Sequence, residues 1–109
     1  MNVDEEPTEE EIFDRAEELE IDDLLLAKES LTKELGSEWR PYRNRKKNIY
    51  YINLKERRAY VDHPIDMEFK ILYAKKNNFL PPKFPSVRVE EIATSMHLVE
   101  EEIRRFQED

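Results

Sequence analysis

The chain has 109 residues, of which 39% are hydrophobic and 40% are charged, and its formal net charge is -8. This length suits one small domain, and the acidic balance argues against general nucleic-acid binding. The absence of cysteine excludes disulfides and thiolate chemistry, and two histidines give no basis for a zinc site or another cofactor. No apolar run approaches the roughly 18 residues of a membrane-spanning helix, and the start is acidic where a targeting peptide would be basic. We therefore expect a soluble intracellular protein.

The N-terminal third predicts a short disordered lead, residues 1–7, and a helical extension, residues 8–36. Thr8 and Glu11 have the spacing of a capping box, in which each side chain bonds to the backbone of the other residue. Apolar residues then recur at helical spacing as far as about Glu20, which predicts a first helix with one narrow apolar stripe.

A second helix is predicted from the aspartates that follow. Asp22 or Asp23 can cap its first turn, and leucines supply apolar positions as far as Leu35. Gly36 is the only glycine of the chain and comes directly afterwards. Glycine tolerates the left-handed conformation that often ends a helix, so we expect Gly36 to be the C-terminal cap.

The central residues 37–64 predict a three-stranded antiparallel sheet, because the stretch has the order of strand, loop, strand, loop, short strand and proline. Side chains alternate between the two faces of a strand. In the second strand this alternation places Tyr50, Ile52 and Leu54 on one face and Ile49, Tyr51 and Asn53 on the other. The expected fold class is α+β, a small sheet flanked by N-terminal and C-terminal helices.

The next segments, residues 65–78 and 79–88, predict a flanking helix and a proline-containing linker. Asp66 can cap the helix, which would then begin at Met67 and end near Lys76. The linker begins with the sequence FLPPKFP, whose prolines lack amide donors and hold their predecessors in extended geometry. Polyproline II is therefore its expected conformation.

The last segment, residues 89–109, predicts one amphipathic helix from Val89 to about Phe106. Its apolar residues recur at three- and four-residue intervals and form a single seam. Such a seam packs either on the sheet or on a second copy of the same helix. Self-association through this helix is thus one expected property of the chain.

The central sheet resembles a WW domain in residue type and spacing: Trp39, an aromatic pair eleven positions later, Asn53 and Pro64. The resemblance implies a three-stranded sheet that binds proline-containing peptides. It also implies that Trp39, Tyr51 and Pro64 form a hydrophobic buckle between the chain ends, that Asn53 makes structural hydrogen bonds, and that Tyr50 lines the ligand groove.

The same comparison shows where this chain departs from the WW pattern. The second groove tryptophan of the family falls at Val61, and the familiar histidine and threonine positions are Leu54 and Ala59. A proline ring binds well between two flat aromatic faces, and valine cannot provide one of them. The predicted ligand-binding face is then an apolar patch, formed by Tyr50, Ile52, Leu54, Ala59 and Val61. A patch of this kind should be covered in a soluble protein.

Two interpretations of this face follow. In the first, the chain is a non-enzymatic adaptor whose face binds a proline-containing segment. In the second, it is a structural assembly unit whose face is occupied by its own helices or by residues 81–84, Pro-Pro-Lys-Phe, a near copy of the Pro-Pro-x-Tyr ligand of WW domains. The first loop of the sheet adds a basic cluster that either is a solvated turn or grips a phosphate next to proline: Arg43, Arg45, Lys46 and Lys47.

A wider resemblance covers roughly residues 5–75. The leader PTEEEIFDRAEELEID and the motifs EWRP, IYYIN and DHPID are similar to a helix-extended WW module of centriolar distal-appendage proteins. This resemblance implies a cytoskeletal setting at the centrosome or basal body of a cilium, and a partner such as the proline-containing tail of a tau-tubulin-type kinase. The carboxylate runs have no nearby nucleophile or metal-ligand pattern, so we expect neither an enzyme nor a metal site.

Overall fold

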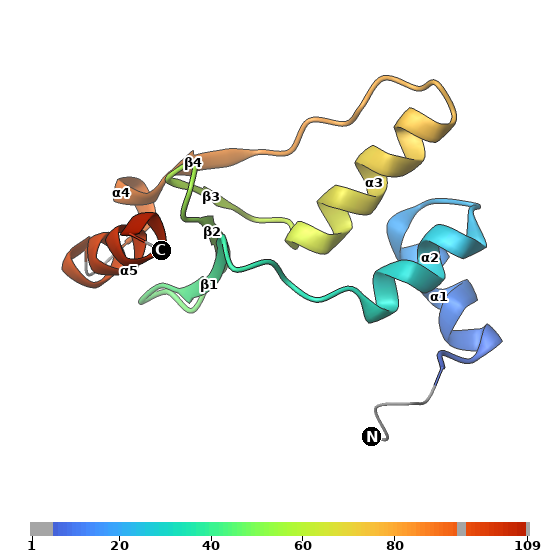
Figure 1. The fold of residues 1–109 in the computed structure, drawn as a ribbon, viewed down its shortest axis with the longest axis horizontal. Coiled ribbons are helices and arrows are strands. Elements are labelled where there is room, and N and C mark those ends of the chain that lie inside the picture. Colours follow the sequence, from blue (N-terminus) through green and yellow to red (C-terminus); the bar gives the residue numbers. More distant parts are fainter. Residues whose placement is uncertain (1–5, 94–95, 109) are drawn as a thin grey trace. The chain divides into compact units, whose positions relative to one another are not determined.

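A computed structural model describes residues 6–93 and 96–108 of the chain (Figure 1). The chain divides into two compact units, which we call the helical unit and the sheet unit. The helical unit extends to Glu34 and includes Ile65–Pro82, whereas the sheet unit comprises Leu35–Pro64 and the residues from Lys83 onward. Both units therefore combine segments that are distant in sequence.

The helical unit begins with α1 (Glu9–Leu19) and its N-terminal cap. The Thr8 hydroxyl oxygen accepts a hydrogen bond from the Glu11 backbone N–H at 3.2 Å, and the Glu11 carboxylate accepts one from the Thr8 backbone N–H at 3.2 Å. This reciprocal pair confirms the predicted capping box. Of the predicted lead, residues 1–5 lie outside the described residues.

Helix α2 (Leu24–Thr32) starts as predicted and ends earlier than predicted. Asp23 is its N-cap, and its carboxylate accepts a hydrogen bond from the Leu26 backbone N–H at 3.1 Å. The expected end at Leu35 with a left-handed Gly36 was wrong, because Lys33 closes the helix in an extended conformation. Gly36 instead begins the turn into the sheet, where its carbonyl accepts a hydrogen bond from the next strand's first residue at 3.1 Å.

Helix α3 (Pro64–Lys76) begins three residues before the predicted start. Proline suits the first helical position, because its missing N–H would have no partner there and its φ is already helical. Asp66 therefore lies inside the first turn, where its carboxylate binds the Arg15 guanidinium at 2.5 Å. The Arg15 Nε also donates to the Ser30 hydroxyl at 2.9 Å, so one half-buried cation joins all three helices.

The end of α3 makes a second polar attachment to the α1–α2 connection. The Tyr73 hydroxyl donates to the Asp22 carboxylate at 2.6 Å, and the Lys76 ammonium binds the Asp23 carboxylate at 2.5 Å. The Lys76 hydrogen bond, aided by the Leu26 backbone N–H, lowers the pKa of Asp23 from its ordinary value of 3.8. In return, the hydrogen bond to Asp23 raises the pKa of Lys76.

The sheet unit contains a four-stranded antiparallel sheet in the order β1 (Trp39–Arg43), β2 (Ile49–Asn53), β3 (Arg58–Tyr60) and β4 (Ser86–Arg88). The sheet therefore has one strand more than predicted. The linker, which was predicted to reach residue 88, ends before Ser86. Residues 86–88 leave the proline segment already extended and pair with the open edge of β3. The Arg58 guanidinium secures this edge through hydrogen bonds to the Ser86 hydroxyl at 2.7 Å and carbonyl at 3.1 Å.

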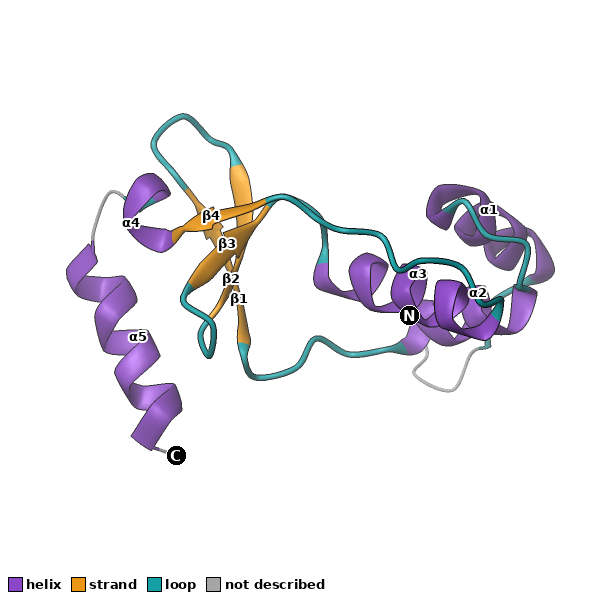
Figure 2. Ribbon diagram, turned by 90° about the horizontal axis from the view of Figure 1, so that it is seen from above, coloured by secondary structure: helices purple, strands orange, loops and turns teal. Residues whose placement is uncertain are grey.

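Two helices follow β4 where the sequence predicted one (Figure 2). Helix α4 (Val89–Ile92) stops at Ala93, whose ψ of 129° is extended, and α5 (Met96–Glu108) begins beyond residues 94–95, which lie outside the described residues. No helix in the described part of the chain is long and apolar enough to cross a membrane.

The Asp23–Lys76 pair predicts a pH dependence of stability. Because the folded-state pKa of Asp23 lies below 3.8, its stabilising contribution is complete above that value and is lost as the pH falls through the folded-state pKa. Asp23→Asn keeps a good helix cap and removes the charge. We expect the variant to melt at a lower temperature than the wild type at about pH 6, and the difference to be smaller at about pH 2.

Thermal unfolding followed by far-ultraviolet circular dichroism measures this difference. Asp14→Asn is the matched control, because it removes an exposed carboxylate from α1. We expect that control to melt within a degree or so of the wild type at both pH values, as surface substitutions usually do. A wild-type advantage over Asp23→Asn that is as large at about pH 2 as at about pH 6 would contradict the assignment.

Candidate peptide-binding face

The predicted ligand-binding face is one side of the central strands, and its register follows from their pairing. Ile52 lies opposite Arg40 on β1 and Ala59 on β3, and Tyr50 lies opposite Tyr42. Cross-strand partners project from the same face of a sheet. The tertiary pairing therefore brings the predicted residues of β2 and β3 together on one surface.

Three of the five predicted ligand residues are fully buried. Ile52, Leu54 and Ala59 expose 1%, 3% and 1% of their surface. They form one apolar cluster with Val89 of α4 and with Val99 and Ile103 of α5. The C-terminal helices thus cover the centre of this face.

The other two predicted ligand residues, Tyr50 and Val61, are less buried than these three. Tyr50 is half-buried and packs against the same cluster, together with Tyr42 and Phe106. Val61 follows the end of β3 and is 61% exposed. Val61 therefore lies at the edge of the face, and its side chain provides no flat surface opposite Tyr50.

The opposite face carries Trp39 and Tyr51, two residues of the predicted buckle. The rings of Trp39 and Tyr60 meet edge to face with centroids 5.4 Å apart, and those of Tyr51 and His63 are tilted at 4.8 Å. Pro64 is buried and opens α3. Aromatic pairs at these separations contribute about 0.5–1.5 kcal/mol beyond their buried area. The aromatic contacts of this face thus involve Tyr60 and His63, which the sequence did not single out for this role.

Burial also affects the hydroxyl of Tyr60. Desolvation, followed by a hydrogen bond that the hydroxyl donates to the Glu56 carboxylate at 2.8 Å, raises its pKa. Both causes keep the hydroxyl protonated, because they disfavour the phenolate. Tyr60 is therefore a neutral donor that joins β3 to the preceding turn.

Asn53 shapes the turn between β2 and β3. Its side-chain oxygen accepts hydrogen bonds from the backbone N–H groups of Lys55 at 3.0 Å and Glu56 at 2.9 Å. Its carbonyl accepts from the N–H of Arg57, whose φ of 60° is left-handed. An asparagine in this position satisfies two turn amides that no strand could pair.

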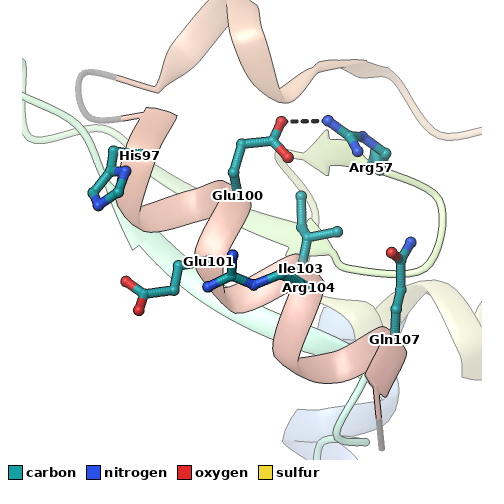
Figure 3. A pocket seen from close by; sticks show the side chains of 7 residues that line it. All are labelled: Arg57, His97, Glu100, Glu101, Ile103, Arg104 and Gln107. Carbon is teal, nitrogen blue, oxygen red and sulfur yellow. Dashed lines mark hydrogen bonds and ion pairs between the residues drawn. The ribbon is translucent and has the colours of Figure 1, made fainter.

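The turn that Asn53 shapes presents Arg57 to both C-terminal helices. Its guanidinium forms an ion pair with Glu100 of α5 (Figure 3). It forms a second ion pair, at 3.8 Å, with Glu90 of α4. On β1, Arg40 pairs with Glu102 of α5 at 3.4 Å. Exposed pairs of this kind contribute at most about 1 kcal/mol each, so they orient α5 while apolar burial holds it.

The predicted phosphate-binding residues surround the turn between β1 and β2. The turn is closed by Asn44, whose backbone and side chain bond to Asn48 at 3.1 and 3.0 Å. The four cations of this region are Arg43, Arg45, Lys46 and Lys47, and all are exposed. Within the described residues none of them forms an ion pair. Their charge is therefore available to a ligand.

Two hollows border α5. The hollow in Figure 3, about 340 Å³, is lined by Arg57 and by polar or charged side chains of α5, with Ile103 as its apolar residue. A second hollow, about 580 Å³, lies between Arg40, Leu54 and Phe106. The described residues contain no cluster of histidine and carboxylate side chains that could hold a metal ion.

No family model matches this chain. The structure has the predicted α+β class with a small antiparallel sheet. A sheet of this size occurs in many unrelated folds, so the likeness to WW domains stays a prediction from residue types and spacing.

The residues that cover the face belong to an apolar pattern that the sequence did show. The seam of the last segment was visible, but helical spacing cannot tell whether a seam faces a sheet or a second helix. The break at Ala93 and the β4 pairing, which together bring Val89 and Ile103 onto the face, left no such pattern.

Burial of Ile103 generates a stability prediction. Ile103→Ala should lower the free energy of unfolding by about 2–5 kcal/mol, because it leaves a cavity in the centre of the cluster. Leu98 of the same helix is 59% exposed, so Leu98→Ala should change the free energy of unfolding by less than about 0.5 kcal/mol. Urea denaturation followed by Trp39 fluorescence provides the measurement, and equal losses for the two variants would show that α5 does not pack on the sheet.

Proposed function

We propose that this chain is a non-enzymatic structural assembly module, in which a WW-like face is occupied by the chain's own C-terminal helices instead of a proline-rich ligand. The observation that supports this proposal is the burial of Ile52, Leu54 and Ala59 beneath Val99 and Ile103. By its resemblance to helix-extended modules of centriolar proteins, its proposed setting is a cytoskeletal or centriolar assembly.

Energetics favour this function over binding of proline-rich peptides on the same face. A peptide that displaced α5 would expose Val89, Val99 and Ile103, which are buried in the cluster. Burial of each such side chain contributes about 1.5–3 kcal/mol, so displacement costs roughly 4.5–9 kcal/mol. A dissociation constant of about 1 μM corresponds to only about 8 kcal/mol of binding free energy. Most or all of the affinity of such a peptide would therefore be lost.

The edge of the face also lacks the shape that a proline ring needs. A ring gains affinity between two aromatic planes, and here Tyr50 already packs on the cluster while Val61 is a small exposed side chain. A peptide confined to this edge would contact one aromatic ring. The uncovered part of the face is thus poorly suited to proline recognition.

Titration of the labelled full chain with proline-rich peptides tests the proposed function. We expect the amide signals of Tyr50 and Ile52 to keep their chemical shifts up to about 1 mM peptide, because the helices already occupy the face. A two-dimensional nitrogen–proton NMR spectrum reads both amides. Val61→Trp restores the second aromatic position and should gain no binding either. Saturable shifts of Tyr50 and Ile52 in the wild type would overturn the proposed function.

A second candidate function is recognition of a phosphorylated segment by the first loop of the sheet. The observation that favours it is the exposure of four cations that form no ion pair within the described residues, in a chain with an excess of acids. Guanidinium groups bind phosphate through charge-assisted hydrogen bonds, which are roughly twice as strong as neutral ones. The loop lies outside the covered face, so both functions are compatible.

A phosphoserine-proline peptide tests this second function against its unphosphorylated form. We expect the amides of Asn44 and Asn48 to shift with the phosphorylated peptide alone, and the affinity to fall as salt is added. Replacing Arg45 by Gln should weaken binding by about tenfold, the loss of one charge-assisted hydrogen bond. Lys55→Gln, which removes an exposed cation from the next turn, should leave the affinity unchanged. Equal shifts with both peptides would exclude phosphate recognition.

A further inference from the structure

The segment between α3 and β4 in Figure 1, residues 79–85, is unusually apolar for a linker. Its sequence FLPPKFP contains one polar residue, and Leu80 is 93% exposed. Phe79 and the three prolines are exposed as well. Flexible spacers are usually rich in glycine and polar residues, which water solvates without cost. This segment instead holds apolar side chains in water.

The segment is also stiff, because three of its seven residues are prolines. Each proline fixes its own φ and holds the preceding residue in extended geometry. Pro82 and Pro85 are three positions apart, which is one turn of a polyproline II helix. In that conformation the two rings line one edge of the segment. A stiff ligand loses little conformational entropy when it binds.

Both ends of the segment are held by the unit they leave. At the first end, the Phe79 backbone N–H donates to the Ala74 carbonyl at 2.8 Å, and the Phe79 ring meets Tyr73 edge to face at 6.1 Å. At the second end, Arg58 bonds to the hydroxyl and carbonyl of Ser86. The residues between these ends have no secondary structure. The chain thus presents the segment instead of burying it.

The segment does not serve as a ligand for this chain's own sheet face. Phe84 is half-buried and leads into β4, while Pro81, Pro82 and Lys83 are exposed. The face that a proline segment would occupy is filled by Val99 and Ile103. A second copy of the chain has the same filled face, which favours a different protein as the receptor of the segment.

We propose that residues 79–85 are a docking segment for another protein that has an aromatic-lined groove for polyproline II. Grooves of this kind take successive apolar–proline pairs between aromatic rings and use main-chain carbonyls of the ligand. Leu80 with Pro81 forms one exposed pair, and Pro82 continues it. Lys83 then provides a positive charge for an acidic residue at the rim of the groove. In this role the chain is the ligand, and its filled sheet face does not interfere with the binding.

The test uses the labelled full chain and two unlabelled probes, an SH3 domain and a WW domain that retains both groove aromatics. We expect at least one probe to shift the amides of Phe79, Leu80 and Lys83 in a saturable way, without affecting Ile52 in the buried face. Replacement of both Pro81 and Pro82 by Ala should weaken the binding by at least about tenfold, since it removes two rings from the groove.

Pro41→Ala is the matched control, because it removes an exposed proline from β1, outside the segment. The control should bind like the wild type, and the melting temperatures of both variants show that each remains folded. The proposal would be overturned if neither probe shifts the segment up to about 1 mM, or if the control and the double variant lose affinity equally. Concentration-dependent shifts of the segment without any probe would also overturn it, because the receptor would then be a second copy.

Discussion

Apolar contact between one face of a small sheet and helix α5 is the interaction on which the sheet unit depends. A sheet of four short strands is only marginally stable in water unless one face packs against another element. Ile52 and Ala59 from the sheet meet Val99 and Ile103 from α5, and each of the four is at most 3% exposed. Strand β4 makes this contact possible, because it pairs with β3 and passes directly into α4. The ion pairs of α5 then fix its orientation at little gain in free energy.

The same contact determines what the surface of the sheet unit offers to partners. Side chains that would line a peptide groove form the core of the sheet unit. The surfaces that remain accessible to partners are therefore the cations of the first loop and the stiff apolar segment before β4. The helical unit has a different basis. Its helices are joined through Arg15 and Asp23, whose charges are each paired with a second helix. The helical unit is therefore sensitive to acid, since the pair with Lys76 lowers the pKa of the Asp23 carboxylate.

Much of the fold was predictable where the deciding interactions are local. The capping box of Thr8 and Glu11 and the cap at Asp23 involve residues three positions apart, and the sequence contains both partners of each bond. Alternation in β2 likewise follows from strand geometry, which assigned Ile52 and Leu54 to one face before their neighbours were known. The misplaced helix ends at Gly36 and Asp66 show the limit of local rules, because several residues can end or begin a helix within one turn.

The sequence by itself determined the first three helices apart from their exact ends, the central strands, the α+β class and the set of apolar residues on the Tyr50 face. Only the tertiary structure decided that β4 exists, that the last segment breaks at Ala93, and that α4 and α5 cover this face. The physical reason is that strand pairing and helix packing join residues up to about half the chain apart, and the free energy of such contacts depends on shape and register that periodicity does not contain. The apolar pattern thus specified what must be buried, and the fold selected the element that buries it.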